Sequence, residues 1–132
     1  MQYMLLIYID EKALTEEDRA KCYQESGRYA HTLNQRGKFI ATAPLQPTST
    51  ATSVRRQTDS ALVTDGPFAE TREQLGGFFL IDAKDLDEAI RIASEIPAGQ
   101  WGTVEIRPIV EVPGLPENFA RPAVDLAGAR PS

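Results

Sequence analysis

The sequence predicts a single α+β domain in which two helices cover one face of an antiparallel sheet. Apolar segments rich in β-forming residues alternate with two helical segments, and each helical segment begins at a capping residue. The chain has 132 residues, of which 42% are hydrophobic and 25% charged. Those values are typical of one globular domain that buries its own core without disulfides or metals.

The first half of the chain predicts a strand, a helix and another strand. Residues 3–9 are a continuous apolar run, as in a central strand buried on both faces. Thr15 and the three acidic residues after it predict a capped helix, which we expect to end near Gly37. Small residues recur along this helix, which indicates either close packing on the sheet or a helix that lines a cavity. Residues 39–45 predict the next strand, which ends between prolines.

The second half predicts a hairpin, a strand, a helix and a final strand. Residues 54–56 and 61–64 are expected to form an exposed hairpin, and residues 77–81 a second buried strand. Asp85 predicts the cap of a helix that ends at Pro97-Ala98-Gly99. The buried face of that helix is expected to hold Leu86, Ala89, Ile90, Ala93 and Ile96. Residues 103–112 alternate between apolar and polar, as in a half-exposed strand.

The order is therefore β-α-β, an inserted hairpin, and β-α-β. Without the hairpin this is the ferredoxin-like split βαβ pattern, with helices on one face of an antiparallel sheet. The other face would be a large apolar patch, so we expect a symmetric homodimer that packs sheet against sheet. After Pro113 the chain becomes rich in Pro, Gly and Ala. We expect residues 1–112 to form the domain and residues 113–132 a tail.

Charge and cysteine content argue against several functions. The net charge of −5 and the pI of about 4.9 argue against direct contact with nucleic acid, which needs basic patches. The single cysteine, Cys22, can form no internal disulfide and is expected to be a small buried hydrophobe. With one histidine and no calcium-loop pattern, we expect neither a metal nor a cofactor. No apolar run is long enough to span a membrane and no secretory signal is evident, so we expect a cytoplasmic protein.

The most diagnostic segment is the loop at residues 65–77, which reads DGPFAETREQLGG. Asp65-Gly66-Pro67 is first of all a turn, because glycine allows positive φ and proline presets the next residue. On those residues alone, the loop would be a plain strand ending with Phe68 filling the core. The longer string resembles the signature of the DGPF proteins, which are members of the YCII-related family. The resemblance covers roughly residues 1–112 and extends to four further motifs: YMLLIY at 3–8, LQP at 45–47, DLDEA at 85–89 and VEIRP at 104–108.

The resemblance implies a fold of the dimeric α+β barrel type. Proteins of that wider group include small cofactor-free isomerases, monooxygenases and dechlorinating enzymes. DGPF-type proteins also resemble companions of extracytoplasmic-function sigma factors, which implies a transcription-linked partner as an alternative. YCII-type relatives carry a His and an Asp as catalytic groups. Asp65 matches the Asp of the loop, and His31 is the only histidine, so the resemblance implies Asp65 and His31 as catalytic residues.

Each candidate also has a structural interpretation. Asp65 would be a general base if it lay buried beside a ligand, or it would cap its own turn. His31 would shuttle protons, or it would be an ordinary helical histidine. Tyr8, Tyr23 and Tyr29 would each supply a hydroxyl to a pocket, or be buried with only the hydroxyl in contact with water.

The rest of the loop supplies the candidate ligand-binding residues. Arg72 would bind an anionic ligand with Glu70 orienting it, or both would be solvated. Gly76 and Gly77 would let a ligand approach the backbone, or form a β-bulge. With Phe68, these residues complete the predicted ligand-binding set.

Two functions of different classes follow. The first is a small cofactor-free enzyme with a pocket between sheet and helices, in which Asp65 exchanges a proton with the substrate. The second is a non-catalytic dimer that binds a small molecule or a protein, with the loop as a structural latch that inserts Phe68 into the core.

Overall fold

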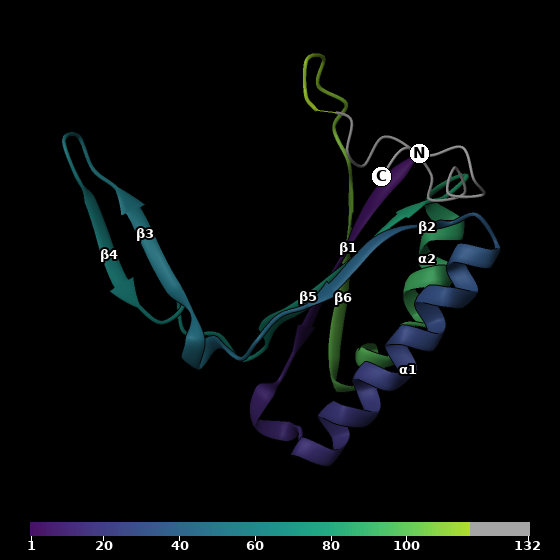
Figure 1. Ribbon diagram of the computed structural model, residues 1–132, viewed down its shortest axis with the longest axis horizontal. Coiled ribbons are helices and arrows are strands. Elements are labelled where there is room, and N and C mark those ends of the chain that lie inside the picture. The colour runs from purple at the N-terminus through teal and green to yellow at the C-terminus, as the bar shows by residue number, and fades with distance from the viewer. Residues whose placement is uncertain (117–132) are drawn as a thin grey trace.

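Four antiparallel strands and two helices form the body of the protein in the computed structural model, which describes residues 1–116 (Figure 1). The strand order across the sheet is β2-β5-β1-β6, which is the ferredoxin-like order that the sequence predicts. Both helices lie on one face of the sheet. The bounds of these elements are β1 Gln2–Ile9, α1 Glu16–Gln35, β2 Phe39–Pro44, β5 Gln74–Asp82, α2 Leu86–Ser94 and β6 Gly102–Pro108.

The inserted hairpin consists of β3 (Thr52–Arg56) and β4 (Ala61–Asp65), which form a separate two-stranded sheet. It projects from the ends of β2 and β5, on the side away from α1 and α2 (Figure 1). We call this hairpin, residues 52–65, the arm. Three short 3-10 turns join the other elements: Glu11–Ala13, Thr48–Thr50 and Pro97–Trp101.

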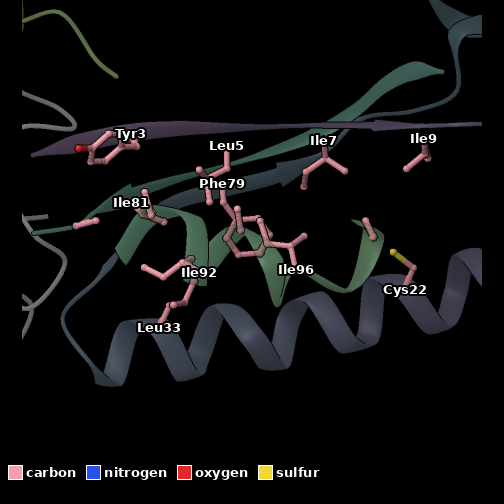
Figure 2. Close-up of a cluster of buried hydrophobic side chains, with 14 residues drawn as sticks. Tyr3, Leu5, Ile7, Ile9, Cys22, Leu33, Phe79, Ile81, Ile92 and Ile96 are labelled. Carbon is pink, nitrogen blue, oxygen red and sulfur yellow. The ribbon is translucent and has the colours of Figure 1, made fainter. Parts of the chain in front are cut away.

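The core lies between the sheet and the two helices (Figure 2). Alternate residues of β1 face the helices and are buried, and β5 contributes Phe79 and Ile81 directly across from them. Leu33 of α1 is completely buried. The side chains that fill this layer are those of Tyr3, Leu5, Ile7, Ile9, Cys22, Leu33, Phe79, Ile81, Ile92 and Ile96. The buried state predicted for Cys22 is therefore confirmed.

Both helices begin at the predicted caps. The Thr15 hydroxyl accepts from the Asp18 amide at 3.0 Å, and the Asp18 carboxylate accepts from the Thr15 amide at 3.1 Å. Gly37, which follows α1, has a φ of +72°, so the predicted glycine stop is confirmed. The Asp85 carboxylate accepts from the Glu88 amide at 2.9 Å and thus caps α2.

Two sequence predictions need correction. The buried face of α2 consists of Ala89, Ile92, Ala93 and the following Ile96, whereas Leu86 and Ile90 are 51% and 48% exposed. A helical period of 3.6 places residues 89, 92, 93 and 96 on one stripe. The last strand ends at Pro108 instead of continuing to residue 112, and Val110 is 75% exposed.

The face of the sheet opposite the helices is not covered by any helix or strand within residues 1–116. Register places the alternate residues of β1 and their β5 partners there, because directly paired residues share a face. We call this surface the open face, and its apolar members are Met4, Leu6, Tyr8, Phe78 and Leu80. Only Leu80 among them is fully buried. The predicted tail, 113–132, lies outside the described residues from residue 117 onward.

Candidate functional site

A cavity of about 160 Å³ lies between α1 and the sheet. Its floor is made by the ends of β1, β2 and β5, and α1 forms its wall. The lining is mainly apolar and comes from Ile7, Ile9, Leu14, Cys22, Gly27, Ala43, Pro44, Leu45, Gly76, Gly77, Phe78, Phe79 and Ala98, together with Arg19, Tyr23, Ser26 and Thr42. Tyr23, Gly27 and Leu45 are exposed, so the cavity opens to solvent beside them.

The small residues of α1 create this space. Cys22, Ser26 and Gly27 all line the cavity and leave room that larger side chains would fill. A Cβ atom built on Gly27 would meet no other atom within 4 Å. Of the two alternatives that the sequence left open for this helix, the structure therefore shows the one in which the helix lines a cavity.

Gly76 and Gly77 line the cavity from β5 and also shape the strand. Ile7 pairs with Gly77 while Tyr8 pairs with Leu75, so Gly76 is the extra residue of a β-bulge. A Cβ on Gly77 would lie 2.9 Å from the Ala43 carbonyl oxygen, so β2 can approach β5 closely only because residue 77 has no side chain. The bulge is therefore present, and both glycines also face the cavity.

The polar groups of the lining are few and include a single charge. Arg19 is half-buried, and its guanidinium forms no hydrogen bond or ion pair with any residue among 1–116. No carboxylate lines the cavity. Burial raises the pKa of the Cys22 thiol, which keeps it neutral, and its sulfur lies 4.0 Å from the Ser26 hydroxyl. The cavity thus combines an apolar body with one cation that lacks an anion.

The residues predicted from the signature loop lie elsewhere. Asp65, Phe68, Glu70 and Arg72 are all exposed, and none of them lines the cavity. The Asp65 carboxylate has no hydrogen-bond partner in the described part of the chain, so it does not cap its own turn. Phe68 is 85% exposed, so the prediction that it fills the core is wrong. Within one chain, only Gly76 and Gly77 of the predicted set meet at the cavity.

His31 is exposed on α1 and does not line the cavity. The arm that ends at Asp65 projects away from α1, so one chain does not bring the predicted pair together (Figure 1). Of the three tyrosines considered, Tyr23 reaches the cavity. Tyr29 donates to the Ile92 carbonyl at 2.9 Å, and Tyr8 lies on the open face, where burial and the nearby Glu105 raise the pKa of its phenol.

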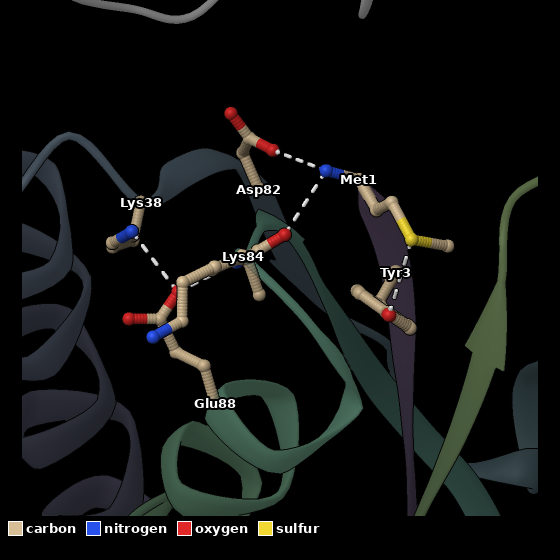
Figure 3. Close-up of polar contacts among 7 residues, drawn as sticks. Met1, Tyr3, Lys38, Asp82, Lys84 and Glu88 are labelled. Atoms are coloured by element: carbon tan, nitrogen blue, oxygen red, sulfur yellow. Dashed lines mark hydrogen bonds and ion pairs between the residues drawn. The ribbon is translucent and has the colours of Figure 1, made fainter.

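A second group of charged residues, at the far end of the sheet, is structural (Figure 3). The Glu88 carboxylate accepts from the Lys84 amide at 2.7 Å and pairs with the Lys38 ammonium at 3.0 Å. These contacts, the backbone bond first, lower the pKa of Glu88. Nearby, the Met1 ammonium pairs with Asp82 at 3.1 Å. Both interactions tie the ends of elements together, and Lys38 and Glu88 also line a pocket of about 240 Å³ with other charged side chains.

Sequence reasoning missed Arg19 and Thr42 as lining residues. Arg19 follows three acidic residues in the first turns of α1, where a basic residue is ordinarily a solvated surface group. A signal was present in the sequence, since Arg19 is one helical turn before Cys22 and two before Ser26, on the face that carries small residues. Among residues 1–116, no group of three or more metal-ligating side chains is present and no helix is long and apolar enough to span a membrane.

The fold and the comparisons define the class of this protein. The sequence matches the family description of the YCII-related domain over residues 1–113, and the chain therefore belongs to the YCII-related family. The resemblance expected from the signature loop is confirmed at the level of the family.

Two relatives agree with that assignment. An uncharacterised protein of Rhizobium meliloti is 36% identical over 114 residues, which cover 83% of this chain and 92% of the relative. A similar solved structure is that of 5-chloro-2-hydroxyhydroquinone dehydrochlorinase from Burkholderia phenoliruptrix, in complex with 2,5-dihydroxybenzoquinone. It has a TM-score of 0.51 and 16% identity, and the match covers 85% of this chain and 96% of that chain. At that identity the similarity shows a shared fold, of the dimeric α+β barrel type.

Proposed function

We propose that this protein is a homodimer that binds a small, mainly apolar anion in the cavity between α1 and the sheet. The observation that supports the proposal is the composition of the lining, in which an apolar cavity contains one arginine and no carboxylate. A half-buried guanidinium without a protein partner is stabilised by a ligand that supplies a carboxylate, phenolate or enolate.

The volume limits the apolar part of the ligand. A dry protein cavity of about 150 Å³ holds one benzene molecule, and this cavity measures about 160 Å³. One six-membered ring or a short branched chain therefore fits. The anionic group would lie toward Arg19, because that residue carries the only charge in the lining.

The dimer is proposed from the open face. Met4, Leu6 and Phe78 lie there, half-buried, with no covering layer from the described residues. A second copy that packs its own open face against this one would bury both patches in a closed two-fold assembly. Sedimentation velocity at micromolar concentration tests this part, and a strictly monomeric species would contradict it.

Ligand binding is tested by thermal shift, because a ligand that binds the native state raises the melting temperature. Benzoate, benzyl alcohol and benzylamine present nearly the same ring with a negative, neutral and positive group. We expect benzoate to stabilise the protein most and benzylamine least. 2,5-Dihydroxybenzoquinone, the molecule in the neighbouring solved structure, is a useful fourth probe.

Matched variants test whether the probes bind in the cavity. Arg19→Gln should abolish the preference for benzoate and leave the folded state intact, whereas Arg19→Lys should retain part of it. Gly27→Leu should fill the space and weaken binding of every probe. Equal stabilisation by all three charge types, unchanged in Arg19→Gln, would contradict the proposal of an anion site.

A proton-transfer enzyme that uses Asp65 is the second candidate. The specific observation in its favour is that this carboxylate is unpaired in the described chain, on the loop that leads into the cavity glycines of β5. The cavity lining itself supplies no carboxylate or imidazole, so Asp65 would have to approach it from outside. A substrate whose turnover is lost in Asp65→Asn, with probe binding retained, would support this candidate.

A further inference from the structure

The arm presents apolar side chains that no other part of residues 1–116 covers. Val54 and Val63 face each other across the hairpin and are 65% and 60% exposed, and Leu62 is 47% exposed. Phe68, just beyond the arm, is 85% exposed. A two-stranded hairpin by itself is only marginally stable in water, and it needs a third strand or a packed apolar face to persist.

The base of the arm is nevertheless anchored. The Glu11 carboxylate accepts from both the amide and the hydroxyl of Thr48, at 2.9 and 2.7 Å, on the chain that leads into the arm. The Glu11 amide donates to the Gln74 side chain at 3.0 Å, on the chain that leaves it. One residue therefore holds both connections, and the direction of the arm is set by the body of the protein.

The start of the loop after the arm is tied to the arm, whereas its end contacts the body through Glu73, whose carboxylate accepts from the Thr103 hydroxyl at 2.9 Å. The Gly66 amide donates to the Ala51 carbonyl at 2.7 Å, and the Ser53 hydroxyl donates to the Gly66 carbonyl at 2.7 Å. Register places Asp65 on the same face of the hairpin as Val54 and Val63. Whatever covers this apolar face will therefore also contact Asp65.

We infer that a second copy of this chain covers the arm, and that it is the same copy that covers the open face in the proposed dimer. This inference rests on the proposed homodimer. The arm projects on the side of the sheet away from the helices, which is the side of the open face (Figure 1). A copy seated on the open face would lie against the arm, and two-fold symmetry would place its own arm against the first copy.

Charge also favours a second copy. Arg55 and Arg56 of the arm form no ion pair with any described residue, whereas the chain as a whole carries a net charge of −5. The excess of acidic residues in a second copy therefore offers partners for these two arginines. The consequence for function is that Asp65 and Phe68 of each chain contact the partner chain. The signature loop therefore reaches its functional environment only in the dimer.

Limited trypsin digestion tests the inference, because Arg55 and Arg56 are cleavage sites on the arm. Cleavage there should be at least about tenfold slower at concentrations that populate the dimer than in dilute monomer, since a packed strand must open before it is cut. Cleavage of Phe68→Ala and Val63→Glu, which add no trypsin site, should be faster at the same concentration, and the dissociation constant of their dimer should rise by about tenfold or more. Leu86→Glu alters an apolar residue of α2 that is 51% exposed and should change neither quantity.

The outcomes separate this inference from the proposal on which it rests. A protein that stays monomeric at all concentrations would overturn both the dimer and the arm contact. A dimer whose arm is cut as fast as that of Leu6→Glu, a variant designed to separate the open faces without adding a trypsin site, would overturn only the arm contact. Circular dichroism of each variant confirms that it is folded before digestion. Neither result affects the thermal-shift test of the cavity.

Discussion

Gly27 lies in the middle of α1 and offers the sharpest test of how the cavity is built. An interior helix glycine costs about 0.8–1.0 kcal/mol relative to alanine. Gly27 has no positive φ, and a Cβ there would meet no atom within 4 Å, so packing does not require the glycine. Gly27→Ala should therefore stabilise the protein by nearly the full amount, about 0.8–1 kcal/mol.

The measurement is urea unfolding at fixed protein concentration. The midpoint should rise with an unchanged m-value, and the melting temperature should increase by about 3–5 °C for a domain of this size. Gly37→Ala is the matched control, since its φ of +72° is unfavourable for alanine and should make that variant less stable. A loss of stability in Gly27→Ala would refute the reasoning, because it would mean that the position is closely packed and not open.

Three further predictions concern other parts of the structure. Gly77→Ala should destabilise by about 1–3 kcal/mol in thermal or urea unfolding, because the new methyl would meet the Ala43 carbonyl at 2.9 Å and backbone would have to move; unchanged stability would contradict the close strand approach. The contacts that lower the pKa of Glu88 stabilise the folded state fully above about pH 4.3, the ordinary pKa of a glutamate. This stabilisation is lost as the pH falls through the lowered pKa of the folded state. In Glu88→Gln the unfolding free energy should therefore fall less steeply with decreasing pH, and an unchanged pH dependence would contradict a stabilising role for the Lys84 amide and Lys38 contacts. Cys22 should react with a disulfide reagent at neutral pH much more slowly in the folded protein than in urea, because burial raises its pKa; benzoate should slow it further, and equal rates would contradict a buried thiol.

Local signals in the sequence were sufficient for most of the fold. Thr15 and Asp85 cap helices through contacts within three residues, so their roles could be predicted without a tertiary structure. The continuous apolar run in β1 predicted a central strand because such a run is typical of strands buried on both faces. The error at Ile90 arose because the choice between two adjacent helical stripes is decided by packing against the sheet, which no local pattern records.

The candidate site was less predictable because it depends on contacts between distant segments. Gly76 and Gly77 could be singled out by type, since paired glycines before a strand indicate a bulge or a close approach. Arg19 could be placed on the small-residue face of α1, but its lack of an anionic partner could not be predicted, because that depends on the absence of any carboxylate across the cavity. The position of Phe68 was predicted wrongly since the sequence does not specify that the arm turns away from the core of its own chain.

The central position of β1 has a consequence for how the chain folds. Tyr3 pairs with Ile81 on one side and with Pro108 on the other, so β1 is joined by two strands that are synthesised much later than it is. Contacts this distant in sequence slow folding, because a long loop must close before any pairing is gained. During synthesis, the apolar first strand stays unpaired until β5 leaves the ribosome, and its second edge stays open until β6 follows. This topology predicts that the domain forms only after β6 is synthesised, and that nascent chains that end before Pro108 depend on chaperones to avoid aggregation.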